Sequence, residues 1–233
     1  MLSTYANFHV DIAARIAELG RQPRAARRLI EDHPDRVLFG IDRSRGGSLR
    51  VEGRGVDFRR PLDAIRSGIA LVPEDRKAQG LFLEMAVREN ESISWLRRCG
   101  AFIDRAGERA MAEELIGQLS IKTPDDRQLV QFLSGGNQQK VVLGKWLALQ
   151  PKILLLDEPT RGVDVGAKQE IYRLMDGLSA RGVAILFVSS DLEEILGMSD
   201  RALVMHQGRI AGELPRAELG EESVMRLATG AAA

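Results

Sequence analysis

Two features at short range, within residues 133–158, restrict what this chain can fold into. Leu133-Ser134-Gly135-Gly136 is a glycine turn that opens a helix, and one helix later the apolar run Ile153–Leu156 ends in Asp157 and Glu158. Free backbone N–H groups and the dipole at a helix N-terminus favour a bound phosphate. Carboxylates at the end of a buried strand are placed to handle Mg²⁺ and an attacking water. The pattern predicts parts of a site for a Mg-nucleotide.

The C-terminal part of the chain predicts an α/β fold with a mostly parallel sheet. Helices and strands alternate there. Helices are expected over 136–149, 166–180, 191–197 and 215–228, and strands over 152–157, 183–188, 202–205 and 209–213. Strands that are apolar along nearly their whole length are buried on both faces, as in a parallel sheet covered by helices. Gly208 predicts a tight hairpin at the sheet edge.

The preceding segment predicts a smaller antiparallel part and a helical insertion. Leu49–Val56 predicts a hairpin, Pro61 opens a short helix that Gly68 ends, and residues 69–72 form a buried strand. Residues 85–130 are mostly helical in pattern, with Asp104 as an N-cap. We therefore expect a helical subdomain over about residues 85–135, inserted between two parts of the sheet.

Composition and charge exclude several classes of protein. Lys plus Arg and Asp plus Glu both number 33, so no overall field attracts nucleic acid or a membrane surface. The longest apolar runs, such as Val183–Val188, are far shorter than the roughly 20 residues of a membrane-spanning helix. The lone Cys99 excludes an internal disulfide. Any membrane role is expected to come through a partner.

The two opening features resemble a known family. Leu133–Gln138 followed by Ile153–Thr160 resembles the signature loop and the Walker B motif of the ATP-binding cassette (ABC) ATPases, and the resemblance runs from about Val37 to Leu227. Finer features are similar to the second cassette of the tandem ATPases of monosaccharide importers of the ribose, galactose, xylose and arabinose type. These are Asn137 in place of the usual Gln, a Q-loop-like Val72–Lys77, a D-loop-like Thr160–Gly166 and a switch-like Val188–Asp191.

The resemblance implies a role for the residues at the strand ends. Asp157 would hold Mg²⁺, and Glu158, one residue further along the pleat, would polarise the water that attacks the γ-phosphate of ATP. Glu74 stands at the position of the Q-loop glutamine and cannot donate a hydrogen bond when ionised. Ser190 stands at the position of the switch histidine and keeps a hydroxyl donor. The structural alternative for Asp157 and Glu158 is a pair of carboxylates that caps a helix.

The signature residues are expected to serve a different nucleotide. In this family two cassettes face head to tail, so Ser134, Gly135, Gly136 and Asn137 would contact ATP that the partner cassette holds. Asp164 would lie at the same interface. The simpler interpretation of Asp164 is an N-cap for the next helix, and it can serve in both ways.

The largest departure from the family is the phosphate loop. The chain contains no G-x-x-x-x-G-K-[ST] sequence. Val37–Gly40 resembles the helix that follows this loop, so the loop should fall near residues 25–32, which contain no glycine and cannot easily form a nest of N–H groups. No apolar strand precedes them, so we expect the first strand of the sheet to be missing.

Residues 1–36 are expected to lie outside the ABC domain, which we assign to residues 37–230. They are rich in Ala and Arg, and residues 11–19 predict an amphipathic helix. Either they form a divergent arm, or they are not the natural beginning of the protein. We favour the second explanation, under which the chain is the C-terminal piece of a longer tandem ATPase.

The function expected from the resemblance is that of an ATP-binding ATPase subunit of a monosaccharide importer, with ATP and Mg²⁺ as cofactors. It would lie peripherally on the cytoplasmic face of the inner membrane. Its partners would be a second cassette, the membrane permease subunits (contacted around residues 80–100) and, indirectly, a periplasmic sugar-binding protein, with no nucleic acid. The isolated chain is expected to be inactive. The alternative is a non-catalytic ABC-fold module that completes a partner's ATP site.

Overall fold

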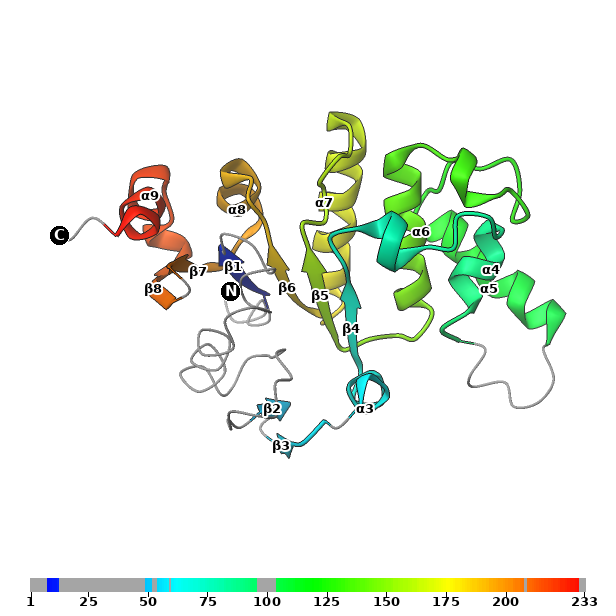
Figure 1. The fold of residues 1–233 in the computed structure, drawn as a ribbon, viewed down its shortest axis with the longest axis horizontal. Coiled ribbons are helices and arrows are strands. Elements are labelled where there is room, and N and C mark those ends of the chain that lie inside the picture. The colour runs from blue at the N-terminus through cyan, green and yellow to red at the C-terminus, as the bar shows by residue number, and fades with distance from the viewer. Residues whose placement is uncertain are drawn as a thin grey trace.

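The computed structural model describes residues 8–12, 49–51, 54–58, 60–95, 104–207 and 209–230. Its centre is a six-stranded sheet with the order β4-β5-β6-β1-β7-β8 (Figure 1). The strands are β4 (Ile69–Val72), β5 (Ile153–Asp157), β6 (Ala184–Val188), β1 (Phe8–Ile12), β7 (Arg201–His206) and β8 (Arg209–Pro215). Neighbouring strands are parallel except at the edge, where β8 pairs antiparallel with β7. The predicted α/β class with a mostly parallel sheet is confirmed.

Both faces of β5 are buried, which explains why this strand is apolar throughout. Leu154 and Leu156 belong to the main core, together with Phe187 of β6. Leu155, whose side chain points to the opposite face, packs with Phe58 in a second cluster. A continuous apolar run is what burial on both faces of a parallel sheet requires.

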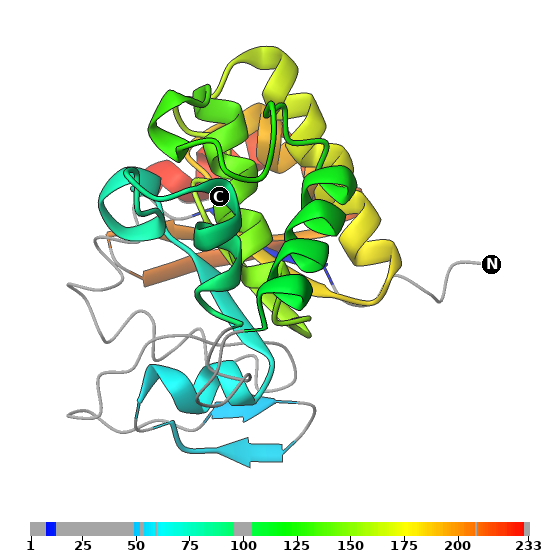
Figure 2. The same cartoon turned by 90° about the vertical axis from the view of Figure 1, so that its right-hand side faces the viewer.

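Different elements cover the two faces of the six-stranded sheet. On one side lie α6 (Gly135–Leu147) and α7 (Val165–Ala180), which supply much of the main core. On the other side lie α3 (Pro61–Arg66) and the hairpin of β2 (Leu49–Val51) and β3 (Arg54–Val56) (Figure 2). At the β8 edge, α8 (Leu192–Met198) and α9 (Glu221–Thr229) pack on a third cluster that contains Val204 and Leu214. Short helical turns also lie within the described residues, at η2 (Arg76–Gly80), η4 (Val130–Phe132) and η5 (Arg216–Glu218).

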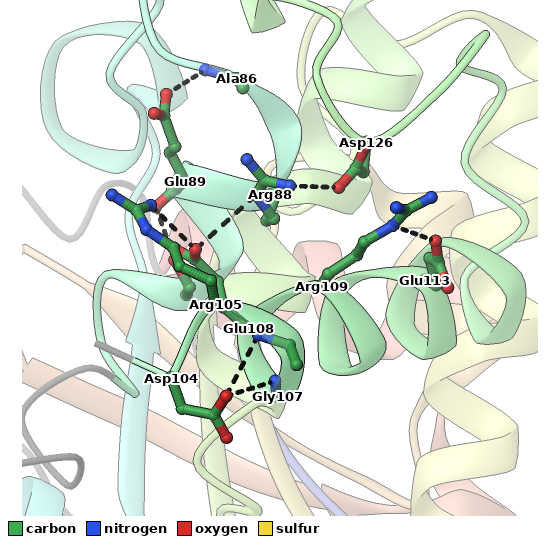
Figure 3. Close-up of polar contacts among 12 residues, drawn as sticks. Ala86, Arg88, Glu89, Asp104, Arg105, Gly107, Glu108, Arg109, Glu113 and Asp126 are labelled. Carbon is green, nitrogen blue, oxygen red and sulfur yellow. Dashed lines mark hydrogen bonds and ion pairs between the residues drawn. The ribbon is translucent and has the colours of Figure 1, made fainter. Parts of the chain in front are cut away.

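The predicted helical insertion is present as α4 (Val87–Ser92) and α5 (Arg105–Gln118), which pack beside α6. Ion pairs hold it together (Figure 3). Arg88 Nη1 of α4 lies 2.8 Å from Asp126 Oδ2, and Arg88 Nε lies 3.7 Å from Glu108 Oε2 of α5. Ser92 Oγ donates to Glu108 Oε1 at 2.7 Å. Because Glu108 and Asp126 are nearly buried, these contacts join α4 to α5 and to the loop that follows it.

Most element boundaries agree with the sequence to within a few residues. Asp104 is the N-cap of α5, where its Oδ1 accepts hydrogen bonds from the N–H groups of Ala106 and Gly107 (Figure 3). Gly68 ends the turn after α3 with a φ of 82°, a value that suits glycine. The terminal helix differs most, because it begins at Glu221 after the short η5 turn rather than near residue 215.

The N-terminal region differs from the expected arm. Phe8–Ile12 forms β1 and lies between β6 and β7, with Val10 opposite both Phe187 and Ala202. The structure thus fills a central position of the sheet that the sequence left without a strand, and the helix expected over 11–19 does not begin at Asp11. Phe8-His9-Val10-Asp11-Ile12 alternates apolar and polar residues, so it lacks the continuous apolar run of its neighbours. The segments 25–32 and 37–40 lie outside the described residues.

Candidate functional site

Asp157 and Glu158 lie where β5 ends at the carboxyl edge of the sheet. Asp157 is the last residue of the strand and pairs with Val188 of β6, and it is only 8% exposed. Glu158 does not continue the pleat as expected, because its φ of 47° turns the chain out of the sheet. Its N–H still donates to Val188 O at 2.9 Å. A left-handed conformation is uncommon for glutamate.

The electrostatics of this pair fit a divalent cation. Burial, and secondly the nearby charge of Glu158, raises the pKa of Asp157 to about 6. A bound cation would offset both effects. The described residues contain no group of three or more His, Cys, Asp or Glu side chains that could enclose a metal ion. Mg²⁺ suits such a site, because it usually takes one or two carboxylates and completes its shell with phosphate oxygens and water.

Neither carboxylate caps the following helix, so the helix-cap alternative for this pair is wrong. The N-cap of α7 is Asp164, whose Oδ1 accepts a hydrogen bond of 3.0 Å from the N–H of Ala167. The predicted cap at Asp164 is therefore confirmed. Its expected place at an interface between cassettes stays a prediction.

The glycine turn is organised around Ser134. This residue is the N-cap of α6, and its Oγ accepts hydrogen bonds from Asn137 Nδ2 at 2.9 Å and from the Asn137 N–H at 3.4 Å. Asn137 Oδ1 in turn accepts from the N–H of Lys122 at 2.8 Å. Asn137 is thus turned toward its own chain. Because both bonds to Ser134 Oγ are accepted ones, the hydroxyl hydrogen is left to donate outward.

Close packing is a second reason for the two glycines. A Cβ at Gly136 would lie 2.4 Å from the Cβ of Ala167 in α7. A Cβ at Gly135 would lie 2.9 Å from Arg76 Nη2 and 3.2 Å from Gly162 O. From the sequence, these glycines were predicted only as phosphate contacts, whereas the structure shows that they also let α7 and the 160–164 loop approach the turn.

The switch-like segment follows β6, the neighbour of β5. Ser190, the expected switch residue, is exposed in the turn before α8. Ser189 is fully buried instead: its Oγ donates to Glu194 Oε2 and accepts from the N–H of Asp191 at 3.0 Å. Ser190 therefore lies on a turn that Ser189 holds from inside. Because β5 and β6 are adjacent, this turn and Asp157 share one edge of the sheet.

Glu74 follows β4, and its expected place at the nucleotide stays a prediction. Its carboxylate forms an ion pair with the guanidinium of Arg161, in the loop after β5. The site thus collects residues after three adjacent strands and at the N-termini of two helices. Both Glu74 and the Ser134 turn lie next to the loop after β5.

Comparison with known proteins decides the family. A family model described as "ABC transporter" matches residues 36–161, more than half of the chain. The chain belongs to the ABC transporter family. As an ABC protein it is similar to a ribose import ATP-binding protein of Streptomyces avermitilis, with 52% identity over 201 residues that cover 85% of this chain and 40% of the relative. An arabinose import ATP-binding protein of Burkholderia thailandensis is 54% identical over 198 residues, covering 83% of this chain and 39% of the relative.

The ABC chain therefore spans about two-fifths of the length of these curated relatives. Solved structures support the fold. The chain resembles cbiO1 of Clostridium perfringens, part of an ABC transporter complex, with a TM-score of 0.70, 20% identity and coverage of 94% of this chain and 82% of that one. An ATP-binding cassette in a dimeric post-hydrolysis state with ADP and Pi gives a TM-score of 0.69, 18% identity and coverage of 90% and 85%.

Sequence reasoning missed three groups of residues in this ABC domain. Arg76 and Arg161 lie within the quoted motifs, yet nothing local showed that they meet. Ser189 and Glu194 form the buried bond beneath the switch turn. Lys140, only 2% exposed in α6, donates to Ser120 O at 2.8 Å and pairs with Glu170 of α7 at 2.6 Å. A lysine on the buried face of a predicted helix is a signal that could have revealed the last group.

No helix within the described part of the chain has the length and apolar character needed to cross a bilayer. This agrees with the short apolar runs of the sequence.

Proposed function

We propose that this chain is an ATP-binding ATPase domain of a monosaccharide ABC importer. One observation carries the proposal: Asp157 and Glu158 at the end of β5 lie beside the switch turn after β6. The Ser134 turn, whose hydroxyl hydrogen is left to donate outward, supports it. Similarity at about half identity to chains named for ribose and arabinose import supports the sugar class. The same similarity supports ATP as the nucleotide.

In this proposal the chain's residues divide between two nucleotides. Asp157 holds Mg²⁺, which neutralises charge on the phosphates when it is bound. Glu158 orients the water that attacks the γ-phosphate, and the Ser190 hydroxyl offers a hydrogen-bond donor from the adjacent turn. Ser134, Gly135 and Gly136 offer donors to the γ-phosphate in a partner cassette. Asn137 positions Ser134, and Asp164 lies at the interface.

The proposed partners are a second cassette, the permease subunits and, through these, a periplasmic sugar-binding protein. We place the chain peripherally at the cytoplasmic face of the inner membrane. The apolar segment 80–85 suits a contact with the permease in part only. Phe82 is 50% exposed and is available for such a contact, whereas Leu81 is 7% exposed and packs in the core.

The test combines this chain with a ribose-type importer cassette that has an intact phosphate loop, and measures ATP hydrolysis. We expect little turnover from the chain alone, turnover from the mixture, and loss of most of it with Ser134→Ala. Glu113→Gln serves as a control, because its ion pair with Arg109 is exposed on α5 far from the site. Absence of stimulation by the wild-type chain in a verified complex would contradict the proposal.

A non-catalytic module that completes a partner's site is the second candidate. It is favoured by the glycine-free segment 25–32 and by the engagement of Glu74 with Arg161. The two candidates differ at Glu158. Glu158→Gln lowers turnover of the mixture if this chain hydrolyses ATP itself. It leaves turnover unchanged, while Ser134→Ala still abolishes it, if the chain only completes the partner's site.

A further inference from the structure

We infer that Arg76 is a positioning residue that joins the loop after β5 to the N-terminal turn of α6, and so couples the Glu158 end of the domain to Ser134. The contacts of Arg76 do not depend on any function. The functional meaning of the coupling rests on the proposed function of Glu158 and of the Ser134 turn.

Arg76 makes two hydrogen bonds across the fold. Its Nη1 donates to Arg161 O at 2.8 Å and its Nη2 donates to Gly162 O at 3.2 Å. Both acceptors are backbone carbonyls in consecutive residues of the loop after β5. The planar fork of a guanidinium matches two neighbouring acceptors, which an ammonium cannot do in the same way. The bonds therefore hold the course of the loop itself, whatever side chains it carries.

The same guanidinium occupies the space where a side chain at Gly135 of the signature turn would lie. A Cβ at Gly135 would lie 2.9 Å from Arg76 Nη2 and 3.2 Å from Gly162 O. Three segments far apart in the sequence thus meet at Arg76: the segment after β4, the loop after β5 and the start of α6. Gly162 has a φ of 65°, so the loop needs a glycine at the point where Arg76 holds it.

A second contact joins two of these segments. Glu74, two residues before Arg76, pairs with Arg161. The side chains are 36% and 65% exposed, so this ion pair is screened by solvent. Arg76 differs in holding the backbone of the loop, through two carbonyls, rather than a side chain of it.

The loop held by Arg76 connects Glu158 to Asp164, which caps α7. A shift of the loop would move Glu158 at one end and the Gly135 contact at the other. Arg76 thus provides a physical link by which the position of the water-orienting carboxylate follows that of the phosphate-reading turn.

The test is hydrogen exchange of this full chain, compared between wild type, Arg76→Ala and Arg76→Lys. Arg127→Ala is the matched control, because Arg127 is exposed on the loop after α5. We expect amides of residues 158–164 and 134–137 to exchange about tenfold faster in both Arg76 variants, while α5 keeps its protection. Unchanged exchange in both segments overturns the inference. A change in 158–164 alone overturns the coupling to the turn, and wild-type behaviour of Arg76→Lys overturns the role of the fork.

Turnover of the mixed assembly gives a second measurement. Arg76→Lys, the milder change, should lower kcat severalfold with little change in the KM for ATP. Faster exchange with an unchanged kcat would also overturn the coupling. If the wild-type mixture shows no turnover, the proposed function fails, and the exchange measurement still decides the role of Arg76.

Discussion

The side-chain amide of Asn137 donates a 2.9 Å hydrogen bond to Ser134 Oγ and accepts one of 2.8 Å from the N–H of Lys122. Asn137 therefore uses both ends of its amide inside the domain. These two bonds fix the direction of the Ser134 Oγ, and the contact of Asn137 with a nucleotide stays a prediction.

Replacing Asn137 by Asp should reverse this bond. A carboxylate only accepts, so it would take the Ser134 hydroxyl hydrogen and would clash electrostatically with a phosphate. The other carboxylate oxygen still accepts from the N–H of Lys122, so the fold should be little affected. We therefore expect the KM for ATP in the mixed assembly to rise about tenfold, with the free energy of unfolding close to that of wild type. Asn137→Gln, which keeps the amide, is the control, and an Asp variant with the wild-type KM would contradict this role.

The contact between Gly136 and Ala167 predicts a specific rescue. Gly136→Ala places a Cβ 2.4 Å from the Ala167 Cβ, so α6 and α7 must separate. Overpacking of this kind usually destabilises by about 1–3 kcal/mol. Denaturant unfolding should show this loss for Gly136→Ala, and the added change Ala167→Gly should recover most of it. Additive effects of the two substitutions would show that the helices do not meet here as described.

The raised pKa of Asp157 predicts that its ionised carboxylate destabilises the folded state at pH values above the titration range. The folded pKa is about 6 and the ordinary value is 3.8. Between these values the folded chain binds more protons, so stability falls as pH rises from about 4 to 6 and stays lower above. Asp157→Asn should raise the free energy of unfolding at pH 8 by about 1–3 kcal/mol, and by much less at pH 4. Mg²⁺ with nucleotide should stabilise the wild type but not the variant, and equal Mg²⁺ effects on both would argue against Asp157 as a ligand.

Glu91 predicts a second pH dependence, away from the site. Its side chain is fully buried in α4, neither oxygen has a hydrogen-bond partner among the described residues, and burial raises its pKa to about 9 from 4.5. The folded state keeps the proton over this range while the unfolded state loses it, so stability falls as pH rises from 4.5 to 9. At pH 7, which lies 2.5 pH units above the unfolded pKa of 4.5, the buried carboxyl lowers the free energy of unfolding by about 3 kcal/mol.

Glu91→Met keeps a similar volume and removes the carboxyl. Thermal unfolding between pH 5 and 9 should show a higher Tm for this variant and a flatter dependence on pH. Glu113→Met, at an exposed position of α5, is the matched control. A slope unchanged by Glu91→Met would mean that another group titrates in this range.

The strands and helices of the C-terminal part were predictable because their cause is local. Leu154, Leu155 and Leu156 are apolar since β5 is buried on both faces, and the N-caps Asp104, Ser134 and Asp164 precede their helices directly. β1 was not predictable in the same way. Its polar residues His9 and Asp11 weaken the local pattern, and its place is set by pairing with β6 and β7.

The same distinction between local and long-range causes applies to the candidate site. The sequence by itself determined the chemistry at the strand end and the turn, namely Asp157, Glu158 and Ser134, because spacing and residue type are read within one segment. Only the tertiary structure decided that Asn137 turns inward to Lys122, that Ser189 rather than Ser190 is buried, and that Arg76 holds Gly162 beside Gly135. These contacts join residues from separate elements, and no local preference encodes which distant backbone a side chain will meet.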